Sequence, residues 1–248
     1  MTDSTIDAKP HPTLADWYGE DAARQGYINR LFDKGSTHYD WVNAVMSFGS
    51  GYRYRDEVLH RTKLQPGMRV LDVACGTGPV AVAAKRIVGP SGRVVGVDPS
   101  RGMLNVARQK VDANFVEALG EALAVRSESF DLVTMGYALR HVSDLLAAFG
   151  EYRRVLKPGG RVVIMEIALP ESRLRRRFLG WYMGRAVPLI TRWGTGSRDA
   201  EQMMRYYWDT TEQCVPPATI LAALRDAGFR EVRRDVQWSM LCEYHGVR

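Results

Sequence analysis

The stretch Leu71-Asp-Val-Ala-Cys-Gly-Thr-Gly78 decides the fold, because an apolar strand turns there sharply into a helix that begins at Pro79. Glycine has no Cβ, so the backbone of this turn can approach a ligand closely, and the helix start offers free N–H groups. No Lys follows Gly78, as a phosphate-binding P-loop requires, and Val80 and Ala81 follow where a dinucleotide fingerprint needs a third glycine. A turn made for packing alone is the other interpretation.

Strand and helix patterns alternate around this turn. Short apolar runs predict strands at residues 69–74, 93–97, 114–116, 130–135 and 161–167. Helices are predicted between them at residues 79–88, from Ser100 to Lys110, and from Ser143 or Asp144 to Leu156, with a turn at residues 157–160 before the fifth strand. This rhythm indicates an α/β fold, a mostly parallel sheet with helices on both faces.

The two ends of the chain differ from this rhythm. We expect residues 1–13 to be a flexible N-terminus and residues 14–248 to form one domain. Helical spacing predicts N-terminal helices within residues 14–64, with turns at residues 34–36 and 48–51, and inserted helices at residues 171–211. A helix opens at residues 216–217, Gly228 caps its end, and strands at residues 230–236 and 238–244 form a hairpin with an antiparallel last strand.

Composition excludes several classes of protein. The chain has 248 residues, 46% hydrophobic and 25% charged, so a disordered chain is excluded. Three scattered cysteines indicate neither a disulfide scaffold nor a metal site. No apolar run approaches the 18 residues of a membrane span, and no secretory signal is visible, so a cytoplasmic protein is expected. The net charge of +6 permits an anionic partner without requiring one.

Asp98 strengthens the interpretation of the glycine turn as a binding site. It ends the second predicted strand, about 20 residues after the turn, where a carboxylate can accept from both hydroxyls of a ribose. The alternative role for Asp98 is a helix N-cap, but Ser100 could fill that role.

Together with Phe130-Asp131 and Leu156-Lys-Pro-Gly-Gly-Arg161, these elements resemble the class I S-adenosylmethionine-dependent methyltransferases. The resemblance implies a Rossmann-like fold with a seven-stranded sheet and S-adenosylmethionine as cofactor. It places Asp72 and the turn residues Ala74, Gly76, Thr77 and Gly78 at the methionine part, Asp98 and Pro99 at the ribose, Leu119 and Gly120 at the adenine, and Gly136 on the sulfonium side. Leu119 departs from the Asp or Asn that family members often carry there.

The segment His38-Tyr-Asp-Trp-Val-Asn-Ala-Val-Met-Ser-Phe-Gly49 narrows the resemblance to the ubiquinone/menaquinone biosynthesis C-methyltransferase family. Matches at residues 118–123, 139–144, 206–211 and 227–229 extend it over about residues 27–246. Three departures lie where substrate chemistry is expected: His141 replaces an Asn, Ile167 and Ala168 replace Phe-Ser, and the ending after Trp238 keeps only His-Gly. The resemblance implies an acceptor that is a hydrophobic quinol or a related aromatic.

Catalytic roles also follow from this resemblance. Methylation of a ring carbon requires that a hydroxyl on the ring be ionised, and the family match points to Arg140, with Tyr39 and the residue after Arg140 assisting. A guanidinium is a poor base, so Arg140 is assigned to polarising a water or stabilising a phenolate. His141 could be the general base, since an imidazole titrates near neutrality; a capping or structural role is the alternative.

The inserted segment combines basic and large apolar residues. As a helix it places Leu174, Phe178, Trp181 and Tyr182 on one face and Arg173, Arg176 and Arg177 mostly elsewhere. Phe178, Trp181, Tyr182, Tyr206 and Tyr207 are therefore candidates for binding the acceptor under a lid. The same segment could touch an anionic membrane surface. A core stripe with a solvated basic face is the plainer interpretation.

Three function hypotheses remain: a quinol C-methyltransferase, a secondary-metabolite O-, N- or C-methyltransferase, and an RNA-binding or RNA-modifying protein of the same fold. The last lacks the motif expected after the fourth strand, where Gly136-Tyr-Ala-Leu139 stands, so no nucleic-acid partner is expected. The five histidines lack spaced partners, so no metal is expected. A homodimer is compatible with the sequence.

Overall fold

A computed structural model describes residues 9–248 as a seven-stranded sheet with helices around it. The strands are β1 (Arg69–Val73), β2 (Arg93–Asp98), β3 (Asn114–Glu117), β4 (Phe130–Gly136), β5 (Leu156–Ile167), β6 (Arg230–Gln237) and β7 (Leu241–Val247). Their order is β3-β2-β1-β4-β5-β7-β6, and β7 pairs antiparallel with β5 and with β6. The predicted sheet with an antiparallel last strand is confirmed.

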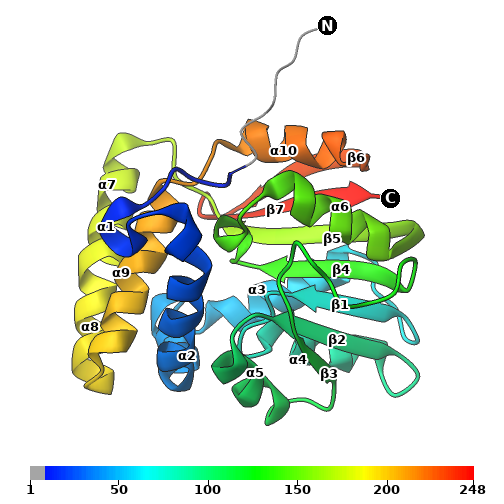
Figure 1. Cartoon of the computed structure of the whole chain (residues 1–248), viewed down its shortest axis with the longest axis horizontal. Helices are drawn as coiled ribbons and strands as arrows, with labels where there is room; N and C mark the ends of the chain where they lie inside the picture. The colour runs from blue at the N-terminus through cyan, green and yellow to red at the C-terminus, as the bar shows by residue number, and fades with distance from the viewer. Residues whose placement is uncertain (1–8) are drawn as a thin grey trace, which may run out of the picture.

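The helices fall into two groups. Five cover the sheet or border it: α3 (Ser50–Arg61), α4 (Pro79–Val88), α5 (Arg101–Arg108), α6 (Leu145–Val155) and α10 (Pro217–Asp226). The others are α1 (Ala15–Tyr18), α2 (Asp21–Met46), α7 (Arg173–Trp181), α8 (Val187–Thr195) and α9 (Arg198–Glu212), with a 3₁₀ turn η1 (Leu139–His141) and a π-helical turn η2 (Tyr182–Ala186). Figure 1 shows α1, α2 and α7 to α9 gathered beyond one end of the strands, on the left.

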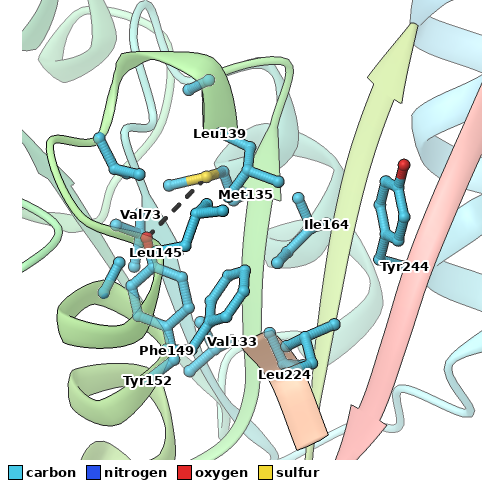
Figure 2. Packing of buried hydrophobic residues seen from close by; sticks show 14 of the residues in the cluster. Val73, Val133, Met135, Leu139, Leu145, Phe149, Tyr152, Ile164, Leu224 and Tyr244 are labelled. Carbon is cyan, nitrogen blue, oxygen red and sulfur yellow. Dashed lines mark hydrogen bonds between the residues drawn. The ribbon is translucent and has the colours of Figure 1, made fainter. Parts of the chain in front are cut away.

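The apolar core lies on both faces of the sheet. On one face α6 and α10 cover β1, β4 and β5, and Figure 2 shows Leu145, Phe149 and Tyr152 of α6 facing Val133 and neighbouring strand residues. The hydroxyl of Tyr152 donates to the sulfur of Met135 at 3.9 Å, which gives this buried phenol a partner (Figure 2). On the other face α3 and α4 pack against alternate residues of the same strands. A third apolar cluster joins α1, α2, α7 and α9.

Two predicted helix starts are confirmed in detail. The hydroxyl of Ser100 accepts from the N–H of Met103, and the carboxylate of Asp144 accepts from the N–H of Ala147, so each residue is an N-cap. Strands β1 and β2 are rich in Val, whose branched side chains fit a sheet buried on both faces.

One predicted turn of the N-terminal region is wrong. Residues 34–36 lie inside the 26-residue helix α2 instead of ending it. A Cβ on Gly35 would stand 2.5 Å from the sulfur of Met203, so this glycine lets α9 approach α2 closely. Of the turn predicted at residues 48–51, Phe48 and Gly49 lie between α2 and α3 with positive φ, whereas residues 50–51 already belong to α3.

Residues 10–13 lie against the fold. The N–H of Val215 donates to the carbonyl of Pro10 at 2.8 Å, and His11 is buried beside Arg24. The hydroxyl of Thr13 donates to Asp21 at 2.7 Å. Residues 1–13 were predicted to be a flexible terminus, and residues 1–8 of this segment lie outside the described part of the chain.

Candidate active site

The turn after β1 forms the floor of a cavity. Ala74, Gly76 and Gly78 all have positive φ, of 51°, 54° and 81°. A Cβ on Gly76 would meet nothing closer than the Tyr39 ring at 3.9 Å, so the backbone here is open to a ligand. A Cβ on Gly78 would lie 3.2 Å from that of Ala107, so this second glycine allows close packing of α5. Thus Gly76 leaves open space beside the turn, whereas Gly78 permits close packing of a helix.

Asp98 joins the turn to the start of α5. One oxygen of its buried carboxylate accepts from the N–H of Gly76 and the other from the N–H of Ser100, each at 2.8 Å. Burial raises the pKa of Asp98 to about 6, while these two hydrogen bonds oppose that shift. A carboxylate has about four acceptor positions, so each oxygen keeps capacity for a ligand hydroxyl.

Helix α2 forms the roof of the cavity and is fastened by two carboxylates. Asp33 accepts from the hydroxyl of Ser100 at 2.6 Å and from the N–H of Gly102 at 2.8 Å. Asp40 accepts from the hydroxyl of Thr77 at 2.6 Å and pairs with Lys110. Neither carboxylate has a predicted role, although Asp40 lies inside the His38-to-Gly49 motif. They hold the N-terminal helix over the glycine turn.

The enclosed space, here called the smaller cavity, has a volume of about 500 Å³. Seven predicted cofactor or catalytic residues line it: Tyr39, Ala74, Gly76, Asp98, Pro99, Gly136 and His141. Its other lining residues were not predicted: Ile28, Asn29, Phe32, Ser100, Met103, Tyr137 and Ala138. The predicted residues Asp72, Thr77, Gly78, Leu119 and Gly120 lie outside this lining.

Asp72 lies fully buried in β1, two residues before Ala74 of the cavity wall. Its Oδ1 accepts from the hydroxyl of Thr134 at 2.8 Å, and Oδ2 has no hydrogen-bond partner among the described residues. Burial raises the pKa of Asp72 to about 7. Such a carboxylate is costly to ionise unless a cation comes near it.

His141 lines the smaller cavity as a neutral ring. It stacks on Tyr206, with ring centroids 5.7 Å apart at 18°, and meets Phe32 edge-on at 5.2 Å. Both ring nitrogens are buried and lack hydrogen-bond partners in the described structure. Burial, together with the charges of Arg140 and Arg24, holds the pKa of His141 well below its usual range.

Arg140 is buried behind this wall and lines neither of the two cavities described here. Its guanidinium pairs with Glu166 at 2.9 Å, donates to the hydroxyl of Thr210 at 3.1 Å and lies 4.0 Å from the ring centre of Tyr207. The guanidinium therefore ties η1 to β5 and α9. This position fits a residue that fixes the cavity wall through its neighbours.

A second, larger cavity of about 1260 Å³ lies beside the first and is mostly apolar. Three predicted acceptor residues line it, Phe178, Tyr182 and Tyr207. The other lining residues come from five regions of the chain: Asn43, Met46, Ser47, Phe48, Ser50, Gly51, Arg55, Tyr137, Ile167, Leu179, Met183, Trp238, Met240 and Leu241. The candidates Trp181 and Tyr206 do not line it: Trp181 is exposed, and Tyr206 packs on His141.

Tyr137 lines both cavities and so stands where they meet. It follows β4 with a positive φ of 60°, which is uncommon for a bulky residue, and its N–H donates to the carbonyl of Met165 at 2.8 Å. Sequence reasoning missed Tyr137 and also Arg55, which lines the larger cavity. A signal for Arg55 existed: it shares a helical stripe with Val58 and Leu59, both core residues.

Within residues 9–248 no cluster of three or more His, Cys, Asp or Glu is placed to hold a metal ion. The same residues contain no helix that is long and apolar enough to cross a bilayer. The expectation from the sequence that the protein binds no metal stays a prediction.

Comparisons with known proteins agree with this geometry. The model of the ubiE/COQ5 methyltransferase family matches residues 20–247. A demethylmenaquinone methyltransferase of Symbiobacterium thermophilum is 37% identical over 228 residues, covering 88% of this chain and 90% of that protein. A ubiquinone/menaquinone biosynthesis C-methyltransferase, UbiE, of Geobacter sulfurreducens is 34% identical, covering 89% and 88%.

Solved structures share the fold. A SAM-dependent methyltransferase from Thermotoga maritima gives a TM-score of 0.64 at 20% identity, covering 88% of this chain and 98% of that one. A phosphoethanolamine N-methyltransferase of Haemonchus contortus, solved with S-adenosyl-L-methionine, gives 0.65 at 18%, covering 93% and 61%. The chain therefore belongs to the ubiE/COQ5 methyltransferase family and is an S-adenosylmethionine-dependent methyltransferase.

Proposed function

We propose that this enzyme methylates a ring carbon of a hydrophobic quinol. The observation that carries the proposal is the pair of cavities that meet at Tyr137, one with a carboxylate and an open glycine turn, the other large and apolar. The names of the relatives support a quinone-type acceptor over the secondary-metabolite and RNA alternatives.

The residues of the smaller cavity fit the cofactor. Asp98 has free acceptor positions for the two ribose hydroxyls, and the open backbone at Gly76 leaves room for the amino-acid part. Asp72 brings an unpartnered buried oxygen near the turn, which suits a ligand with a positive charge. Leu119 and Gly120 stay the predicted neighbours of the adenine. Gly136 lines the smaller cavity directly before Tyr137 in the sequence, and it stays the predicted neighbour of the sulfonium.

When bound, the cofactor supplies a methyl group on a cationic sulfur: the methyl–sulfur bond breaks with its electron pair left on sulfur, a ring carbon of the quinol forms the new bond, and the ring hydrogen leaves as a proton. The protein contributes the position of the acceptor. Phe178, Tyr182 and Tyr207 can hold an aromatic ring against Tyr137 in mostly apolar surroundings.

His141 is a weak candidate for the general base in this arrangement. It faces the smaller cavity rather than the acceptor cavity, and its lowered pKa makes its nitrogens poor proton acceptors. We propose that His141 packs as a neutral ring beside the cofactor. Arg140, held by Glu166, positions η1, which carries His141.

The proposed function is tested with purified enzyme, isotopically labelled S-adenosylmethionine and a panel of quinols of increasing side-chain length. Mass spectrometry should find a product one labelled methyl heavier, and demethylating reagents that cleave aryl methyl ethers should leave it intact. No product from any quinol, or a label lost on ether cleavage, would refute ring-carbon methylation.

We also propose that the helix α7 region touches an anionic membrane. Leu174, Phe178 and Trp181 expose apolar side chains on this helix, and the arginines between them are exposed too. Each basic group near an anionic surface contributes about 1 kcal/mol, and exposed aromatic rings suit the interface. Phe178 also lines the larger cavity, so contact there would bring a lipid-like acceptor to the entrance.

Vesicle co-sedimentation tests this contact. Binding should require anionic lipid, weaken with salt, and fall for the double variant Arg175→Glu/Arg176→Glu. A matched variant with two exposed arginines on other surfaces, Arg93→Glu/Arg225→Glu, should bind nearly as the wild type does. Equal loss of vesicle binding in both double variants would show that net charge alone explains the binding, and it would refute a specific contact by the α7 region.

A further inference from the structure

Arg55 is a buried cation in the wall of the larger cavity. It lies on α3, its side chain is mostly covered, and the residue is 8% exposed. Nη1 donates to the carbonyl of Gly51 at 2.9 Å, and the guanidinium carbon lies 4.9 Å from the ring centre of Tyr137. Nε is buried without a hydrogen-bond partner among the described residues. The cation thus sits beside the residue that separates the two cavities.

No carboxylate within residues 9–248 forms an ion pair with Arg55. Two other buried arginines near the cavities have more partners: Glu166 pairs with Arg140 and Thr210 accepts from it, while Nη2 of Arg24 donates to the carbonyl of Arg140 and lies 3.2 Å from the ring of His11. Burying a charge without a partner is costly, so fully buried arginines are normally paired. The contrast indicates that Arg55 is kept for an anion that a ligand brings.

The groups around Arg55 do not supply that anion. The tyrosines within its electrostatic reach have a raised pKa, mainly through burial, so their hydroxyls stay neutral: Tyr39, Tyr52, Tyr137 and Tyr207. Asp72 acts on it from a distance and is itself held by Thr134. Burial brings the pKa of Asp72 to about 7, so this carboxylate is only partly ionised near neutrality.

We propose that Arg55 binds the ionised hydroxyl oxygen of the quinol and stabilises its charge while the adjacent ring carbon is methylated. The hydroxyl proton passes to solvent water at the cavity mouth, and the oxygen's negative charge drives electron density onto the ring. A guanidinium that is already desolvated stabilises such a charge more strongly than water does. This inference rests on the proposed function, since it names how that acceptor is recognised.

Gly51 leaves room for the guanidinium of Arg55. A Cβ at this position would stand 2.9 Å from Nη1 of Arg55 and 3.1 Å from the hydroxyl oxygen of Ser47. Gly51→Ala therefore displaces the guanidinium while the charge remains. It provides a second variant that perturbs the same group without removing it.

The kinetic test compares Arg55→Met with Arg53→Met, which removes an exposed arginine two residues earlier on the same helix. For Arg55→Met we expect kcat with a quinol to fall about 100-fold, as for loss of one oxyanion donor. The rising limb of its pH–rate profile should move to higher pH. Arg55→Lys should recover part of the rate, and Gly51→Ala should show a smaller loss. An Arg55→Met rate within twofold of the Arg53→Met rate would overturn the proposal.

A binding test separates this inference from the proposed function. A hydroxynaphthoquinone changes colour on ionisation, so its spectrum reports which form the protein binds. Wild-type protein and Arg53→Met should lower the apparent pKa of the bound dye, whereas Arg55→Met and Gly51→Ala should lower it less. If wild type binds the anion but methylates no quinol, the proposed function fails while Arg55 stays an anion site. Equal dye titration in wild type and Arg55→Met would refute the anion site.

Discussion

At the scale of single residues, environment and not residue type decides the roles at this site. His141 and Arg140 are neighbours in sequence, yet one faces the smaller cavity as a bare ring and the other is locked to Glu166 behind it. The sequence could place both beside the cofactor through the family motif. It could not reveal that His141 is buried against Tyr206, because that contact joins residues 65 positions apart, and burial is the main cause of the lowered pKa of His141.

His141→Asn tests the role of this ring. Since a histidine with so low a pKa is already neutral, we expect kcat to stay within about fivefold of wild type and the pH–rate profile to keep its shape. Steady-state rates from pH 6 to 9 provide the measurement. A large loss of rate, with the disappearance of one ionisation from the profile, would restore His141 as general base.

Asp72 gives a prediction for stability against pH. Its folded pKa, about 7, lies above the unfolded value, so the native state binds the proton more tightly and loses stability as pH rises from about 4 to about 7. Asp72→Asn removes this dependence. Relative to wild type, the cofactor-free variant should gain stability over that window by up to about 1.4 kcal/mol per pH unit. Urea unfolding at several pH values measures it, and a pH-independent difference would contradict the assignment.

At the scale of elements, the strand–helix alternation of residues 69–167 was readable because each short apolar run ends at a turn or a cap. The N-terminal region was harder, since Gly35 has the appearance of a turn residue. Its actual role, close packing against Met203, depends on a helix 168 residues away and leaves no local signal. The same limit hid Asp33 and Asp40, whose partners lie on α5 and in the glycine turn.

Helix α2 should act as a fastened roof for the cofactor. Asp33→Ala removes the acceptor for Ser100 and Gly102, which we expect to cost about 1–2 kcal/mol of unfolding free energy. Affinity for S-adenosylmethionine should fall several-fold, because the roof loosens where Phe32 lines the cavity. Calorimetry and thermal melting measure the two effects. The adjacent exposed Lys34→Ala is the control, and an unchanged affinity in Asp33→Ala would contradict the role of the roof.

At the scale of the whole molecule, cofactor binding should be visible as stabilisation. A ligand at 100 times its Kd adds about 2.7 kcal/mol to the unfolding free energy. S-adenosylmethionine and its demethylated by-product should therefore both raise the melting temperature of wild type and of Asp112→Asn, an exposed control. In Asp98→Asn, which loses the charge between Gly76 and Ser100, most of this rise should vanish. A rise in the melting temperature of Asp98→Asn as large as that of wild type would mean that the ribose does not bind at Asp98.

The layered sheet, its antiparallel last strand and the family were all readable from the sequence, because local patterns and two motifs carry them. The acceptor cavity was readable only in part. Phe178, Tyr182 and Tyr207 were expected, but Tyr137 and Arg55 come from segments that only the folded chain brings to one wall. The lining of a cavity that is formed by the ends of α2, α3, α7 and β7 leaves no periodic pattern in the amino-acid sequence.

The most direct measurement is a crystal structure with the demethylated cofactor product and a quinol bound together. We expect ribose hydroxyls on Asp98, the sulfur next to Gly136, and the quinol ring in the larger cavity with one oxygen on the guanidinium of Arg55. The ring carbon to be methylated should point past Tyr137 toward the sulfur. A quinol bound outside the larger cavity, or a ribose away from Asp98, would refute the proposed arrangement of cofactor and acceptor.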